Sequence, residues 1–192
     1  MPGDATTDRE WPPPTTPGGK ALAHARKVLA RPLEDRRERG GRNQGPIVRE
    51  CAEWLFRAHG DMALYERLYR TSNLPWCACF AGWCYQEGGT NVARWWSASC
   101  DSLWVRLLGQ ETRGKAQVRR WPVDPKTVEP GDLTFWGDPG DLNHVDLWER
   151  CDGTTLWTLG GNTGHPVADR VDRTARLLVA ADRLFGVARV LG

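Results

Sequence analysis

The first half of the chain has apolar residues at helical spacing. Segments 20–30, 47–58 and 92–108 each carry apolar residues three and four positions apart, which predicts amphipathic helices. A shorter helix followed by a loop is expected over 61–73. Residues 1–19 are rich in Pro, Thr, Gly and Asp and lack the apolar residues to form a core, so they predict a flexible tail.

After residue 114 the pattern changes to the alternation of β-strands. Strands are expected over 133–135, 144–148, 154–159, 167–171 and 185–190. The Cys-Asp-Gly sequence at 151–153 is a hairpin signal between two of them. Helices followed by antiparallel strands predict an α+β fold, and the length favours one domain over residues 20–192.

One stretch, residues 74–85, combines helix signals with candidate chemistry. Pro75 stands at a helix start, where a missing N–H costs nothing, and Gly88 follows where the helix ends. Cys77 then falls in the first turn of this helix. Free N–H groups and the positive end of the helix dipole stabilise a thiolate there, so the pKa of Cys77 is expected below its usual value of about 8.5. Cys77 is the candidate nucleophile.

Among the four histidines, His144 is the best candidate for a base. It opens a predicted strand, and a strand start is rigid enough to aim a side chain. Asn162 ends the following strand, where its amide can fix the imidazole tautomer. A cysteine that attacks, a histidine that moves the proton and an amide that orients the histidine make a hydrolytic site, in the chain order of papain-like proteins. The predicted catalytic residues are Cys77, His144 and Asn162.

Composition and charge narrow the other possibilities. A net charge of +2 gives no strong field for nucleic acid, so no such partner is expected. No apolar run reaches the roughly 18 residues of a membrane helix, and no secretory signal opens the sequence. We therefore expect synthesis in the cytoplasm with the six cysteines reduced, the alternative being a disulfide framework.

A metal-binding module is a further alternative. Cys77, Cys79, Cys84 and His144 offer thiolate and imidazole ligands. A Cys-x-Cys pair inside an apolar helix is poor zinc spacing, however, because structural zinc sites favour Cys-x₂₋₄-Cys knuckles. No metal and no cofactor are therefore expected.

The motifs of the chain resemble those of the CHAP group, the cysteine, histidine-dependent amidohydrolases and peptidases, across residues 20–192. The matching pieces, in family order, are Asn43-Gln44-Gly45-Pro46, Pro75-Trp76-Cys77-Ala78, Pro130-Gly131-Asp132, His144-Val145 and Gly161-Asn162-Thr163. The resemblance implies a papain-like fold whose helices pack on a small antiparallel sheet. It also implies a monomer that cleaves amide bonds in the peptide part of bacterial peptidoglycan, at the cell wall, often as a phage lysin. Calcium binds some relatives, but no ligand set for it can be assigned here.

Two positions depart from the family pattern. Many members carry Glu two residues before the asparagine, where this chain has Gly160, and glycine often follows His-Val, where this chain has Asp146. Residues 144 and 146 of a strand lie on one face, so Asp146 is a second group within reach of His144. The departures keep two alternatives open: a wall-binding or phage structural protein with a decayed site, and a toxin or effector that uses the same triad on another amide.

Overall fold

The computed structural model describes residues 14–39, 42–163, 170–178 and 183–192. The five α-helices of this part are α1 (Pro17–Leu29), α2 (Pro46–Ala58), α3 (Met62–Arg70), α4 (Cys77–Glu87) and α5 (Cys100–Glu111). The strands are β1 (Ala116–Arg120), β2 (Leu133–Asp138), β3 (Asp141–Cys151), β4 (Thr155–Thr163), β5 (Arg170–Leu177) and β6 (Leu184–Val190). Two short 3₁₀ helices, Leu33–Asp35 and Pro125–Thr127, lie in the connections.

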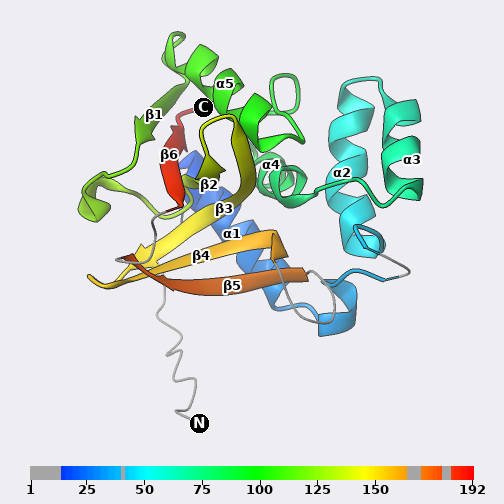
Figure 1. Ribbon diagram of the computed structural model, residues 1–192, viewed down its shortest axis with the longest axis horizontal. Helices are drawn as coiled ribbons and strands as arrows, with labels where there is room; N and C mark the ends of the chain where they lie inside the picture. The colour runs from blue at the N-terminus through cyan, green and yellow to red at the C-terminus, as the bar shows by residue number, and fades with distance from the viewer. Residues whose placement is uncertain (1–13, 40–41, 164–169, 179–182) are drawn as a thin grey trace.

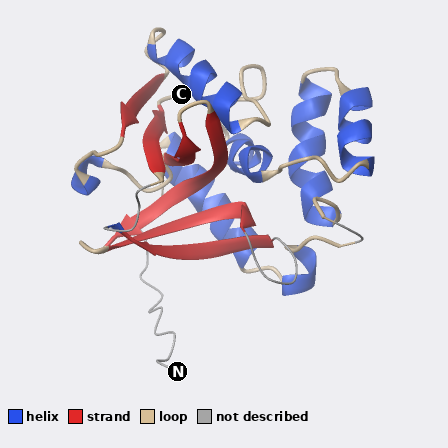
Figure 2. Ribbon diagram, in the orientation of Figure 1, coloured by secondary structure: helices blue, strands red, loops and turns tan. Residues whose placement is uncertain are grey.

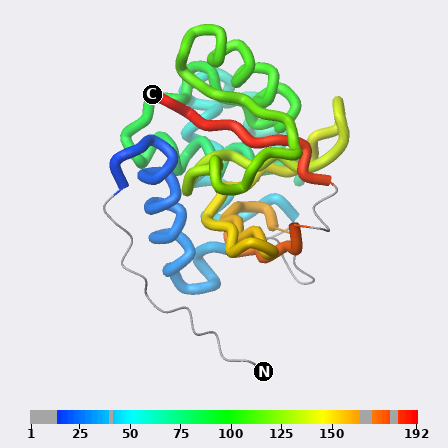
Figure 3. Tube along the Cα trace, turned by 90° about the vertical axis from the view of Figure 1, so that its left-hand side faces the viewer, coloured from blue at the N-terminus to red at the C-terminus, as the bar shows by residue number. Residues whose placement is uncertain are grey.

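The six strands form one antiparallel sheet in the order β1-β6-β2-β3-β4-β5. Figures 1 and 2 show the helices gathered beside this sheet, with α2 and α3 as an outer pair. The side view in Figure 3 shows α1 next to the sheet and β6 running beside β1. The prediction of an α+β fold, with helices first and antiparallel strands after, is confirmed.

Helix α4 is the centre of the molecule. It contacts α1 and α2 on one side and strands β3 and β4 on the other. Every residue from Cys77 to Tyr85 is buried, because the segment is apolar on all sides rather than along a single stripe. Trp96 packs across the helix and donates its indole N–H to the carbonyl of Ala78 at 2.7 Å.

The structure differs from the sequence expectations at three places. The helix expected over 92–108 begins only at Cys100, where the Ser99 side chain accepts from the N–H of Ser102. Helix α1 starts at Pro17 rather than near residue 20. Strand β1 was not expected from the sequence. Of the tail predicted over 1–19, residues 1–13 lie outside the described residues, and residues 17–19 belong to α1. The first part of the strand expected over 167–171 also lies outside the described residues.

Candidate active site

Cys77 is the first residue of α4, as the sequence predicts. Pro75 lies two residues ahead of it, and the preceding Trp76 donates its indole N–H to Glu38 at 2.9 Å, which fixes the start of the helix in the core. The Cys77 side chain is fully buried. The N–H groups of the first helical turn have no partner within the helix, so they are available to an anion at this point.

The sulfur of Cys77 lies among three hydrogen-bonding groups. Cys100, the first residue of α5, brings its Sγ to 3.7 Å, and Cys77 is also hydrogen-bonded to His144 and to the backbone of Val145. Contact with Cys100 and His144 outweighs the cost of burial and lowers the pKa of Cys77 well below its usual value. The site therefore favours a thiolate.

His144 lies on β3 and keeps 15% of its side chain exposed. Its Nε2–H donates to Oδ1 of Asp146 at 2.7 Å, which leaves Nδ1 as the ring nitrogen available to Cys77. Burial lowers the pKa of His144, but the Asp146 carboxylate and the contact with Cys77 more than offset this and raise it to about 10. A protonated imidazole beside a thiolate is the result.

Asp146 is fully buried two residues further along β3. Its second oxygen, Oδ2, accepts from the Thr158 hydroxyl at 3.0 Å and from Nη1 of Arg176 at 3.2 Å. Burial raises the pKa of this carboxyl, but His144, Arg176 and Thr158 together bring it below its usual value. Asp146 is thus an ionised carboxylate in direct contact with the imidazole.

Asn162 lies near the end of β4 with a left-handed backbone (φ +58°), a conformation that asparagine tolerates better than most residues. Its Oδ1 atom is buried and has no hydrogen-bond partner among the residues that the structure describes. Within the described part of the chain, no hydrogen bond joins Asn162 to His144. Of the three residues predicted from the sequence, the structure brings Cys77 and His144 into contact, and the role of Asn162 stays a prediction.

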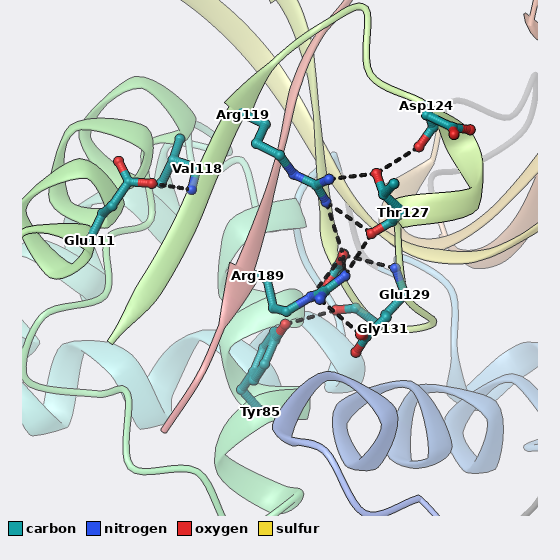
Figure 4. Close-up of polar contacts among 10 residues, drawn as sticks. Tyr85, Glu111, Val118, Arg119, Asp124, Thr127, Glu129, Gly131 and Arg189 are labelled. Carbon is teal, nitrogen blue, oxygen red and sulfur yellow. Dashed lines mark hydrogen bonds and ion pairs between the residues drawn. The ribbon is translucent and has the colours of Figure 1, made fainter. Parts of the chain in front are cut away.

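The Pro-Gly-Asp motif lies where α4, β6 and the turn before β2 meet, and Figure 4 shows Tyr85 and Arg189 beside Gly131 of this turn. Asp132 is buried and binds Arg189 of β6 at 2.9 Å, and its Oδ2 also accepts from the N–H of Glu129. The Tyr85 hydroxyl of α4 donates to the carbonyl of Gly131 at 2.7 Å. Through these contacts the motif holds α4 and β6 against the turn that leads into β2.

Among the described residues, no group of three or more His, Cys, Asp or Glu side chains is arranged to hold a metal ion. All six cysteines carry free thiols. None of the helices in this part of the chain has the length and apolar character that a membrane span requires.

A buried cysteine at the start of α4 and a histidine on β3 together form a thiol–imidazole pair. Residues 69–162 match the CHAP domain family. The match supports a CHAP-type domain in this part of the chain, and the matched range includes Cys77, His144 and Asn162.

Two solved structures are similar to this chain at low identity. "The crystal structure of Ly7917" is 14% identical, with coverage of 90% of this chain and 62% of that one and a TM-score of 0.42. "The crystal structure of Ly7917 with the hydrolyzing product of MDP" is 17% identical, with coverage of 91% and 63% and a TM-score of 0.42. The chain spans less than two thirds of the length of these structures. No curated protein gives a significant match.

Proposed function

We propose that this protein hydrolyses an amide bond in the peptide part of bacterial peptidoglycan, in the manner of an endolysin amidase or endopeptidase. The CHAP-type domain supports a hydrolase that acts on peptidoglycan. The observation that carries the proposal is the contact between Cys77 and His144. Cys100 and His144 together lower the pKa of the Cys77 thiol, and Asp146 and Cys77 together raise the pKa of the His144 imidazole. An ordinary buried cysteine of this chain, such as Cys51, has its pKa raised instead.

The reaction follows from this arrangement. The Cys77 thiolate attacks the carbonyl carbon and forms a C–S bond, while backbone N–H groups at the start of α4 stabilise the oxyanion. The imidazolium of His144 gives its proton to the leaving nitrogen as the C–N bond breaks. His144 then takes a proton from water, the hydroxide attacks the thioester, and the carboxylate product leaves as the thiolate is restored.

The same contacts favour an enzyme over a binding or structural protein with a decayed site. In a decayed site the groups around the cysteine need not be matched in charge. Here Cys77, His144 and Asp146 form a continuous chain of hydrogen-bonded, alternately charged groups. A toxin or effector that acts on another amide would need the same series of linked groups. The substrate therefore distinguishes a peptidoglycan hydrolase from a toxin or effector.

Digestion of purified peptidoglycan by the full-length protein tests the proposal. The wild type is expected to release fragments with new free amino groups, identified by mass spectrometry, and Cys77→Ala is expected to release none, because the nucleophile is gone. Cys151→Ser is the matched control, since this thiol lies at the far end of β3, in the hairpin. Circular dichroism checks that each variant is folded. Digestion by Cys77→Ala at the wild-type rate would show that the proposal is wrong.

A further inference from the structure

We propose that Asp146, on the same strand as the histidine, is the positioning residue that orients the His144 imidazole, in place of a side chain from the neighbouring strand β4. The inference rests on the proposed function, since the orientation of His144 matters to catalysis only if the Cys77–His144 pair carries the reaction. It assigns to Asp146 the role for which the sequence suggested Asn162.

The first argument is the direct contact. Oδ1 of Asp146 lies 2.7 Å from Nε2 of His144, the short distance of a charge-assisted hydrogen bond. The two residues are two apart on β3, so their side chains lie on the same face of the strand. Because the carboxylate accepts the Nε2–H, the imidazole is kept in the tautomer whose Nδ1 faces Cys77.

The second argument comes from Gly160 on β4. A Cβ atom added to this glycine would overlap Oδ1 of Asp146. The carboxylate therefore occupies the space into which a side chain at position 160 would project. Position 160 of β4 therefore offers no side chain to orient His144, and Asp146 of the adjoining strand β3 places its carboxylate in that space.

The third argument is the support around the other carboxylate oxygen. Oδ2 of Asp146 is bound by Thr158 and by Arg176, and the guanidinium of Arg176 lies 4.2 Å from the ring centre of Trp136. These contacts fix the plane of the carboxylate, so that Oδ1 points at the imidazole. A fixed second contact of this kind is typical of groups that orient a catalytic histidine.

Asn162 lacks the corresponding contacts. Its Oδ1 has no partner, although the atom is buried, and no hydrogen bond to His144 is found among the described residues. The titratable or charged groups in contact with the His144–Asp146 pair are Cys77 on α4 and Arg176 on β5. The negative charge that faces His144 from its Nε2 side is therefore that of Asp146.

The test compares Asp146→Asn with Asn162→Ala in the full-length protein. Asp146→Asn keeps the size of the side chain and removes its charge. We expect kcat on solubilised peptidoglycan to fall by roughly 10² or more with little change in KM, since loss of an orienting carboxylate acts on the transition state. The pKa of His144, followed by NMR of the imidazole, should move down towards its ordinary value of 6.5.

Asn162→Ala is expected to leave the pKa of His144 close to that of the wild type and to lower kcat less than Asp146→Asn. This second variant keeps the proposal testable if Asp146→Asn fails to fold. A fall in the pKa of His144 in Asn162→Ala, or an unchanged pKa in folded Asp146→Asn, would overturn the assignment. An active Cys77→Ala variant would instead overturn the proposed function, so the two failures are distinguishable.

Discussion

At the scale of single residues, the charge on Cys77 depends on its sulfur neighbour as well as on His144. Cys77 and Cys100 are the first residues of α4 and α5, so the positive ends of two helices meet at the sulfur pair. The thiol of Cys100 donates towards Cys77 and makes the largest contribution to its low pKa. The sequence does not point to Cys100 as part of the site, because nothing in its spacing shows that the two helix starts meet.

Replacing Cys100 tests this contribution. In Cys100→Ala the donor is lost, so the pKa of Cys77 rises and the acid limb of the kcat/KM profile moves to higher pH. In Cys100→Ser a hydroxyl donor remains, so the acid limb stays near that of the wild type. The alkaline limb, which follows loss of the His144 proton at a pKa of about 10, should be common to all three proteins. If the acid limbs of Cys100→Ala and the wild type coincide, Cys100 does not contribute to the low pKa of Cys77.

The sequence predicts part of this site for clear physical reasons. The start of the Cys77 helix can be read from local residues. His144 is predicted from the start of a strand, but β3 begins three residues earlier, at Asp141, so the residue is right and its expected place in the strand is wrong. Asp146 was identified only as a second group on the same face as His144. The carboxylate of Asp146 occupies the space next to Gly160 that a side chain at position 160 would fill, and no local pattern reveals this.

At the scale of elements, α4 is fitted tightly against Trp96. A Cβ on Gly82 would lie within 2.5 Å of the Trp96 indole, whereas a Cβ on Gly109 of α5 would meet nothing within 4 Å. The same contact explains the helix start predicted too early at residue 92. The apolar residues Trp95 and Trp96 follow helical spacing, but Trp96 serves packing on α4 in a segment outside any helix.

These two glycines form a matched pair for mutation. Gly82→Ala gains about 1 kcal/mol of helix propensity but overpacks a rigid indole, so we expect a net loss of about 1–2 kcal/mol in the free energy of unfolding. Gly109→Ala gains the propensity alone and should stabilise by about 0.5–1 kcal/mol. Urea denaturation measures the free energy of unfolding of both variants. A stabilised Gly82→Ala protein would show that α4 is not constrained by this contact.

The sequence pattern does not predict strand β1, because the position of this strand in the sheet leaves it half exposed. Its sequence, Ala-Gln-Val-Arg-Arg, is half exposed at the edge of the sheet and pairs only with β6. A polar edge strand of this kind has little apolar alternation to detect. The inner strands, whose apolar residues are buried, were predicted from their patterns.

At the scale of the whole molecule, the fold brings together groups that are far apart in the chain. Helix α4 lies between the outer helices and the sheet (Figure 1). The ion pair of Asp132 with Arg189 links β6 to the turn before β2, and Figure 4 shows Arg189 beside Glu129 and Gly131 of this turn. The succession of helices and then strands along the chain is predictable from pattern, as is the α+β class, whereas β1 and the order of the strands within the sheet are not. The approach of Cys77 to His144 required the fold itself, because 66 intervening residues separate them.

The central claim is that folding turns Cys77 into a thiolate paired with the His144 imidazolium. The most direct measurement is the ultraviolet absorbance of the thiolate, taken as the difference between wild type and Cys77→Ser, at neutral pH, before and after unfolding in urea. The account predicts a thiolate signal in the folded protein that disappears on unfolding, where the pKa of Cys77 returns to about 8.5. A folded protein whose Cys77 signal emerges only near that ordinary pKa would contradict it.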